Sequence, residues 1–175
     1  MHDGTLEWLP QENIYYPHSV AGTRTVVRLH GAARFIGWEI SCFGLPANQL
    51  DLKSGRVRQC FELWHDDRPV LLERLAVDAA VLSARWGLAG RASSGTLLIY
   101  PAGNAQLERA RELAQGHADA AGDTSLACTL VDNALCCRGI AARVDRLKQA
   151  FIDLWIALRP ELIGRPASPP RIWLT

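Results

Sequence analysis

The chain has 175 residues, of which 49% are hydrophobic and 21% are charged, and its formal net charge is +1. These values are close to the averages for globular proteins, so we expect one domain over residues 1–175 with a substantial hydrophobic core. A net charge so close to zero provides no basic field for nucleic acid or anionic lipid, which argues against nucleic-acid and membrane partners. We find neither a signal peptide nor an apolar run of membrane-spanning length, and therefore expect a cytoplasmic protein.

The first hundred residues are predicted to form β-strands separated by turns. Residues 34–42 alternate between two faces, and a period of two is typical of a strand. Residues 57–64 alternate in the same way, and the turn formers at 65–69 lead into an apolar run at 70–77, which predicts a β-hairpin. In the strand at 34–42, one face carries Ile36, Trp38, Ile40 and Cys42, and the other carries Phe35, Gly37, Glu39 and Ser41.

Helical periodicity follows in the second half of the chain. Residues 104–116 repeat apolar side chains at helical spacing, with Asn104 as the cap and Gly116 as the stop. A stronger pattern covers residues 140–158, where apolar side chains recur at steps of three and four residues and Pro160 follows the last of them. These patterns predict two amphipathic helices.

The segment between the two predicted helices contains two further strands. Residues 125–131 and 134–138 are predicted to pair around a turn at 132–133, and residues 117–123, rich in Ala, Gly and Asp, are predicted to form a loop. No tandem repeat and no change of composition marks a second domain. The sequence therefore predicts a mainly β fold with two α-helices.

The five cysteines follow no familiar disulfide or metal-binding pattern. Their number is odd and no Cys-x-x-Cys spacing occurs, so reduced thiols are the simplest interpretation. Cys136 and Cys137 are adjacent in a predicted strand and point to opposite faces, so they cannot hold one ion without distorting the pleat. We interpret the cysteines as small buried side chains, with a soft-metal site as the alternative. The five are Cys42, Cys60, Cys128, Cys136 and Cys137.

Familiar catalytic motifs are absent from the sequence. The Gly-rich segment 87–96 lacks the Gly-Lys-Ser/Thr ending of a phosphate loop, so we interpret it as a turn before a strand. There is no Gly-x-Ser-x-Gly elbow and no His-Glu-x-x-His helix, and the five histidines occur singly. We therefore predict that the chain is not an enzyme and holds no cofactor tightly.

Seven short motifs give the chain a resemblance to a known family. The most informative are 34–42 (Arg-Phe-Ile-Gly-Trp-Glu-Ile-Ser-Cys), 6–12 (Leu-Glu-Trp-Leu-Pro-Gln-Glu) and 170–175 (Pro-Arg-Ile-Trp-Leu-Thr). The seven motifs extend over the whole chain, and in their order along it they resemble those of the urease accessory protein UreD family, also called UreH. One departure is Leu45, where the family pattern leads us to expect Arg. The other four motifs are 55–59, 67–75, 87–98 and 155–160.

The resemblance implies more about the fold than the periodicity does. Family members stack their strands into a helical, solenoid-like β architecture. They also carry on the order of a hundred residues before the motif found here at 6–12, so the chain resembles the carboxy-terminal portion of the family fold, truncated at the amino terminus. Such a portion exposes strand edges and apolar surface, and we expect it to be less soluble than longer family members.

The resemblance also implies a function. Family members are non-catalytic chaperones that dock on apo-urease and assist nickel insertion into its active site. The partners implied are the urease structural subunits, a UreF-type helical accessory protein and, through the complex, a UreG-type GTPase. Nickel is then expected in transit rather than as a resident cofactor, because an ion held too tightly cannot be passed on.

Four residues are predicted to make transient nickel contacts. Glu12 and Glu39 are carboxylates flanked by apolar sequence, so they either pair with Arg34, Arg58 or Arg74 or line a polar passage. His65 and Asp66 occupy the predicted hairpin turn, where they either bind nickel weakly or are simply solvated.

Three further residues are predicted to bind partners. Trp86 beside Gly87, together with Arg171 and Trp173 near the end of the chain, combine residue types favoured at interfaces with weak strand or helix patterns. The alternative function is a small metal- or thiol-dependent enzyme in which the fold brings Cys136, Cys137 and His65 together. Tight stoichiometric metal binding that is lost on replacing these residues favours that alternative.

Overall fold

The computed structural model describes residues 1–117 and 123–174, and within them the fold is mainly β. Most of the predicted loop at 117–123 lies outside the described residues. The helices are α1 (Ala79–Ser83), α2 (Asn104–His117) and α3 (Val144–Ile163), with 3-10 turns η1 (Pro46–Asn48) and η2 (Arg171–Leu174). The strands are β1 (Thr5–Trp8), β2 (Asn13–Tyr15), β3 (Val20–Leu29), β4 (Arg34–Phe43), β5 (Arg56–His65), β6 (Arg68–Val77), β7 (Ser93–Tyr100), β8 (Thr124–Val131) and β9 (Ala134–Ala141).

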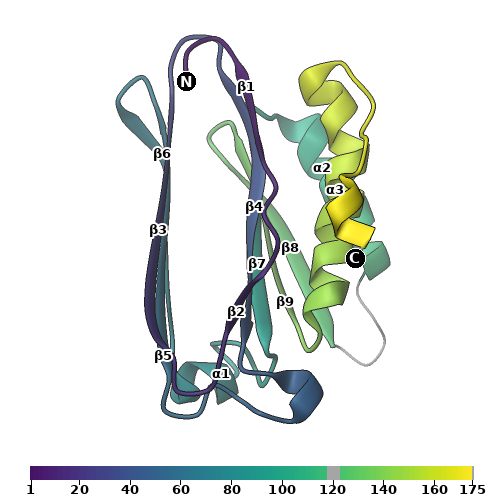
Figure 1. Cartoon of the computed structure of the whole chain (residues 1–175). Coiled ribbons are helices and arrows are strands. Elements are labelled where there is room, and N and C mark those ends of the chain that lie inside the picture. Colours follow the sequence, from purple (N-terminus) through teal and green to yellow (C-terminus); the bar gives the residue numbers. More distant parts are fainter. Residues whose placement is uncertain (118–122, 175) are drawn as a thin grey trace.

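The strands form a large and a small sheet. In the large sheet the order is β1-β4-β7-β9-β8, and β2 pairs with the same strand β4 further along, so β1 and β2 share one edge and run parallel to β4. In the small sheet the order is β3-β5-β6, with β3 parallel and β6 antiparallel to β5. Three layers result: the small sheet, the large sheet, and helices α2 and α3 on the far face of the large sheet (Figure 1).

Strand β4 separates the two layers of core, as its alternation predicts. Ile36, Trp38 and Ile40 are buried against the helices, whereas Phe35 belongs to the apolar cluster between the sheets. A strand whose two faces are both covered by other layers must carry apolar residues on both, which explains why nearly every residue of β4 is buried. The predicted strand and its assignment of faces are confirmed.

The predicted hairpin is also confirmed. Strands β5 and β6 are joined at Asp66 and Asp67, whose φ angles are +46° and +61°. Two consecutive positive φ angles are the geometry of a type I′ turn, which matches the twist of the flanking strands. Strands β8 and β9 likewise pair around the predicted turn at 132–133.

The helices differ from prediction in number and in their ends. Helix α3 begins at Val144 rather than at 140, because Ile140 is paired in β9, and it continues through Pro160 to Gly164, whose φ of +74° ends it. The predicted count of two α-helices is wrong by one, since α1 adds a five-residue helix capped by the Asp78 side chain. A single turn is too short to produce a visible helical period.

No helix in the described part of the chain is long and apolar enough to cross a membrane.

Two interior regions hold the three layers together. The core between α2, α3 and the large sheet is continuous and apolar. The space between the two sheets is apolar at its ends, around Phe61 and Leu63 at one end and around Leu52 and Val57 at the other.

Candidate functional site: a cavity between the two sheets

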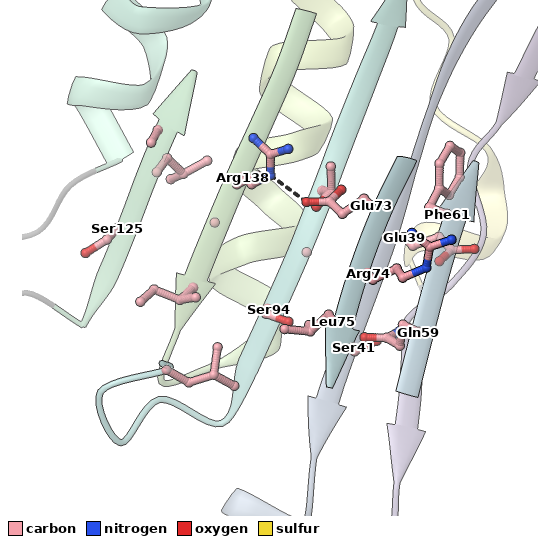
Figure 2. A pocket seen from close by; sticks show the side chains of 17 residues that line it. Glu39, Ser41, Gln59, Phe61, Glu73, Arg74, Leu75, Ser94, Ser125 and Arg138 are labelled. Atoms are coloured by element: carbon pink, nitrogen blue, oxygen red, sulfur yellow. Dashed lines mark hydrogen bonds and ion pairs between the residues drawn. The ribbon is translucent and has the colours of Figure 1, made fainter. Parts of the chain in front are cut away.

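A cavity lined by both apolar and polar residues occupies the middle of the space between the sheets. Its volume is about 320 Å³, and strands of both sheets line it (Figure 2). The two apolar clusters close off the space on either side along the strands. The polar and charged residues that line the cavity are Glu39, Ser41, Gln59, Glu73, Arg74, Ser94, Thr96, Ser125 and Arg138.

Strand alternation places these polar groups inside the protein. In β4, Glu39 and Ser41 share the inner face with Phe35 and Phe43, which belong to the two apolar clusters. In β6, Glu73 lies between inward-facing Leu71 and Leu75 in the same way. Residues two apart in a strand point to the same face, so a polar side chain between two inward apolar neighbours also points inward. It could face solvent only if the strand shifted its register and exposed those neighbours, so the fold holds it in the cavity.

Glu39 is a partly buried carboxylate of the cavity wall. Its Oε1 accepts a hydrogen bond from the Thr25 hydroxyl of the small sheet. Burial raises the pKa of the Glu39 carboxyl; the Thr25 hydrogen bond opposes this rise and the nearby negative charge of Glu73 adds to it. Among the described residues Glu39 forms no ion pair, so the expected pairing with Arg34, Arg58 or Arg74 does not occur.

Three polar contacts cross the cavity from one sheet to the other, one from each strand of the small sheet. The Thr25 hydroxyl of β3 donates to Glu39, and Gln59 Nε2 of β5 donates to Ser41 Oγ at 2.7 Å. The third contact is ionic: Arg138 Nε of β9 donates to Glu73 Oε1 of β6 at 2.5 Å, and Figure 2 shows the two side chains pointing toward each other. Only this third contact carries a cation.

The lining of the cavity includes two carboxylates, of which Glu73 is paired with Arg138. Two carboxylates and several hydroxyl and amide oxygens are the kinds of ligand that hold divalent ions without thiolate-like affinity. Among the described residues, no group of three or more His, Cys, Asp and Glu side chains is arranged to hold a metal. The cavity therefore contains oxygen donors, but the described residues do not arrange them as a metal site.

Glu12 lies elsewhere, in the connection between β1 and β2. Its Oε2 is 3.0 Å from Lys148 Nζ of α3, and the same ammonium donates to Gln11. Glu12 therefore forms an ion pair, but with a lysine of the helical layer rather than with the arginines considered from the sequence. The structure does not bring Glu12 and Glu39 into one site.

His65 and Asp66 lie at the hairpin turn, as predicted, and contact the loop after β3. His65 Nε2 is 2.8 Å from the Gly31 carbonyl oxygen, and Asp66 Oδ1 accepts from the Gly31 amide at 3.2 Å. His30 Nδ1 is 3.6 Å from the same Asp66 oxygen. These contacts fasten one end of the small sheet, and neither His65 nor Asp66 lines the cavity.

The residues predicted to bind partners differ in exposure. Trp86, in the connection between α1 and β7, is 80% exposed. Arg171 is exposed in η2, whereas Trp173 packs against Trp38 and Trp155 with ring centroids 5.3 and 5.4 Å apart. Trp86 is thus available to a partner, while Trp173 already contributes to the core beside α3.

The cysteines occupy the positions that the alternation predicts. Cys136 faces the space between the sheets and Cys137 faces the helices, and both are fully buried. Burial raises the pKa of the Cys136 thiol to about 12, which leaves very little thiolate at neutral pH. His65 contacts the Gly31 carbonyl oxygen and the Tyr100 ring, and Cys136 and Cys137 belong to different apolar clusters on opposite faces of β9.

Glu73 and Arg138 were not singled out by sequence reasoning. The sequence pattern could have identified both, because each is a charged residue on the apolar face of an alternating strand. Glu73 lies between Leu71 and Leu75, and Arg138 lies between Cys136 and Ile140. Their pairing, however, depends on how the two sheets stack, which no local pattern encodes.

Comparison with known proteins identifies relatives over almost the whole chain. Residues 2–174 match the family described as UreD urease accessory protein. The chain is 36% identical over 173 residues to a protein named Urease accessory protein UreD from Alcanivorax borkumensis, covering 98% of this chain and 58% of the relative. Proteins of the same name from a Marinomonas and an Enterobacter strain are 36% and 35% identical, covering 97% and 99% of this chain.

These relatives are longer than the chain. The matched region spans 57% of the Marinomonas protein and 60% of the Enterobacter protein. The match to the family nevertheless extends from residue 2 to residue 174, a range that includes both sheets and the helical layer. The chain belongs to the UreD family of urease accessory proteins.

Proposed function

We propose that this chain acts as a non-catalytic chaperone that binds apo-urease together with accessory partners and assists nickel insertion into the metallocentre. The observation that carries the proposal is the match to the UreD family over residues 2–174, with relatives named urease accessory proteins. The chain spans between 57% and 60% of three of these relatives, so the activity of the longer proteins is carried over as part of the proposal.

The proposal includes specific partners and a location. The chain binds the urease structural subunits and a UreF-type helical accessory protein, and a UreG-type GTPase takes part through the complex. Exposed Trp86 and Arg171 are the proposed contacts with these partners. The five free thiols support a reducing, cytoplasmic location.

Nickel is proposed to pass through the cavity between the sheets as cargo. The oxygen donors of Glu39 and Glu73 support this role, because hard-to-borderline donors release Ni²⁺ more readily than thiolates do. Glu12, His65 and Asp66 remain proposed transient contacts at separate places on the surface. No tightly bound cofactor is part of the proposal.

The architecture of the family is part of the same proposal. The small sheet stacks face to face on the large sheet across the cavity, which supports the solenoid-like stacking of strands expected for the longer relatives (Figure 1). In that arrangement a polar space between stacked sheets extends along the stack. The cavity described above is then one segment of a longer passage.

Affinity capture tests the proposal. The chain is co-expressed with apo-urease subunits and the two accessory proteins, with the longer Alcanivorax borkumensis relative as a positive control. The proposal expects urease subunits to be retained by the chain and to be released by Trp86→Ala. Retention by the relative but not by this chain contradicts the proposal for this chain.

A further inference from the structure

We propose that the outward face of the small sheet is a docking surface for an acidic segment of a partner protein. Figure 1 shows this sheet as the outermost layer of the fold, on the side away from α2 and α3. The proposal does not rest on the proposed function, which places partner contacts at Trp86 and Arg171, outside the three strands of this sheet.

The outward face of the small sheet is strongly basic. Alternation in β3, β5 and β6 directs five arginines outward, and all five are exposed. Glu62, which is 6% exposed, is the only carboxylate on the outward face of these three fully described strands. Five positive charges therefore face one negative charge, on a chain whose net charge is +1. The arginines are Arg24, Arg28, Arg56, Arg58 and Arg74.

The single carboxylate of this face is already hydrogen-bonded. Glu62 Oε1 accepts from Arg24 Nε and Nη2 at 3.0 and 2.9 Å, and Oε2 accepts from Trp64 Nε1 at 3.0 Å. The guanidinium groups of Arg58 and Arg74, in contrast, form no hydrogen bond or ion pair within the described part of the chain. Two cations on this face thus remain available to acidic groups of another molecule.

The two available arginines border a hollow. In the strand register Cys60 lies between Arg24 and Arg74, and Arg58 lies two residues from Cys60 along β5. Neighbouring strands are about 4.8 Å apart, so three long side chains surround one small one. The hollow has a volume of about 520 Å³, and guanidinium groups at its border can bind carboxylates in bidentate fashion. The small outward-facing residues that line it are Gly22, Cys60 and Ala76.

Apolar side chains on the same face favour a protein over a nucleic acid. Val20, Val26 and Leu72 are 83%, 37% and 45% exposed, and the combination of arginine with apolar side chains is typical of protein interfaces. Sheets that bind single-stranded nucleic acid present aromatic rings on which bases stack. The aromatic ring of this face, Trp64, is instead covered by Arg28, whose guanidinium carbon lies 5.2 Å from the ring centroid.

Peptide binding to the purified chain tests the docking surface. The probe is a short fluorescein-labelled peptide in which Glu and Val alternate, and the control peptide alternates Gln and Val. By fluorescence anisotropy, we expect the Glu peptide to bind at least about tenfold more tightly than the Gln peptide. The double variant Arg58→Gln with Arg74→Gln should lose about tenfold in affinity for the Glu peptide.

A matched double variant controls for total charge. Arg109→Gln with Arg146→Gln removes two exposed arginines from the helical layer and should change the affinity less than about twofold. Equal losses in the two double variants indicate a general charge effect and overturn the proposal. Equal affinity of the wild type for the two peptides overturns it as well.

Alkylation of Cys60 by iodoacetamide, measured by mass spectrometry, locates the bound peptide. Cys60 is the one cysteine of the chain that is not buried, and it lines the hollow. Saturating Glu peptide should slow its alkylation about tenfold by covering the thiol. An unchanged rate overturns the proposal, and this readout on the wild type decides the matter if Arg58→Gln with Arg74→Gln does not fold by circular dichroism.

A single-stranded DNA oligonucleotide provides the last comparison. If it displaces the Glu peptide and protects Cys60 at lower concentration than the peptide does, the face binds nucleic acid and the proposal of an acidic protein partner is overturned. Failure of urease capture, with binding of the Glu peptide intact, contradicts the proposed function alone. Normal capture without peptide binding contradicts the docking surface alone.

Discussion

Glu7 in the first strand and Arg159 in the last long helix are joined by two hydrogen bonds. Arg159 Nη2 donates to Glu7 Oε1 at 2.7 Å and Nε donates to Oε2 at 2.9 Å, while Trp155 Nε1 donates to the same Oε2 at 2.9 Å. Both charged side chains are largely buried. This bidentate contact fastens β1, which forms part of the edge of the large sheet, to the helical layer.

Replacing Glu7 with Gln is expected to destabilise the fold by about 1–3 kcal/mol at pH 7, the range for hydrogen bonds to charged groups. The hydrogen bond from Arg159 lowers the pKa of Glu7, against the opposing effect of burial. A lowered pKa contributes stability that is present above the unfolded value of about 4.3 and is lost as pH falls through the folded pKa. The difference between wild type and variant should therefore shrink in acid.

Urea denaturation at several pH values checks this prediction. The control is Glu112→Gln, which breaks an exposed 3.3 Å pair with Arg109 on α2 and should change the free energy of unfolding by less than about 0.5 kcal/mol. A Glu7→Gln difference that stays constant from pH 7 to pH 3 contradicts the assignment of this stability to the Glu7 carboxylate.

The contribution of Glu39 to stability should depend on pH in the opposite direction to that of Glu7. Burial raises its pKa, so the folded state binds the Glu39 proton more tightly than the unfolded state does. Stability from this group is then fully present below the unfolded pKa and declines as pH rises through the folded pKa. We expect Glu39→Gln, which still accepts a hydrogen bond from Thr25, to raise the thermal midpoint at pH 7 and to leave it unchanged below pH 4.

Thermal denaturation of the two proteins across this pH range measures the effect. A lower midpoint for Glu39→Gln at pH 7 indicates that the ionised carboxylate is stabilising, and it contradicts the burial argument. The Ser94→Ala variant serves as a control, because it alters a polar residue of the same cavity without changing its charge.

Trp86 and Trp173 should separate binding from stability. Trp86→Ala removes an exposed ring and is expected to change the free energy of unfolding by less than about 0.5 kcal/mol while weakening partner capture about tenfold or more. Trp173→Ala removes a ring packed on Trp38 and Trp155 and is expected to destabilise by about 2 kcal/mol. Denaturation curves and capture assays on both variants check the contrast, and equal stability losses contradict it.

The double variant Glu39→Gln and Glu73→Gln tests the cavity as a route for nickel. We expect it to capture urease as the wild type does but to reduce nickel-dependent activation at least about tenfold, because both cavity carboxylates are neutralised. Glu108→Gln with Glu112→Gln on the exposed face of α2 is the matched control. Undiminished activation by the cavity variant excludes a route through these two residues.

Local patterns predict the strands well in this protein, because the layers impose strict alternation. The faces of β4, the hairpin at 65–68 and the opposite orientations of Cys136 and Cys137 all follow from a period of two. The start of α3 could not be placed, since Ile140 fits a helical stripe and a strand face equally well. Its pairing in β9 decides the matter.

The site was predictable only in part. Glu39 was identified as a carboxylate on an apolar strand, and the structure places it in the cavity. Its neighbours there, Thr25, Glu73 and Arg138, come from three different strands of two sheets, and their proximity depends on long-range stacking. The same stacking keeps Glu12 and His65 away from the cavity, although in sequence both are closer to Glu39 than Glu73 and Arg138 are.

Urease activation in a defined system tests the central claim most directly. Apo-urease, the two accessory proteins, GTP and Ni²⁺ are incubated with and without this chain, and both the nickel content and the activity of the re-isolated urease are measured. The account predicts that adding the chain raises both quantities together, and that the chain is recovered unchanged. Nickel content and activity equal to those of the reaction without the chain, when the Alcanivorax borkumensis relative raises both, would contradict it.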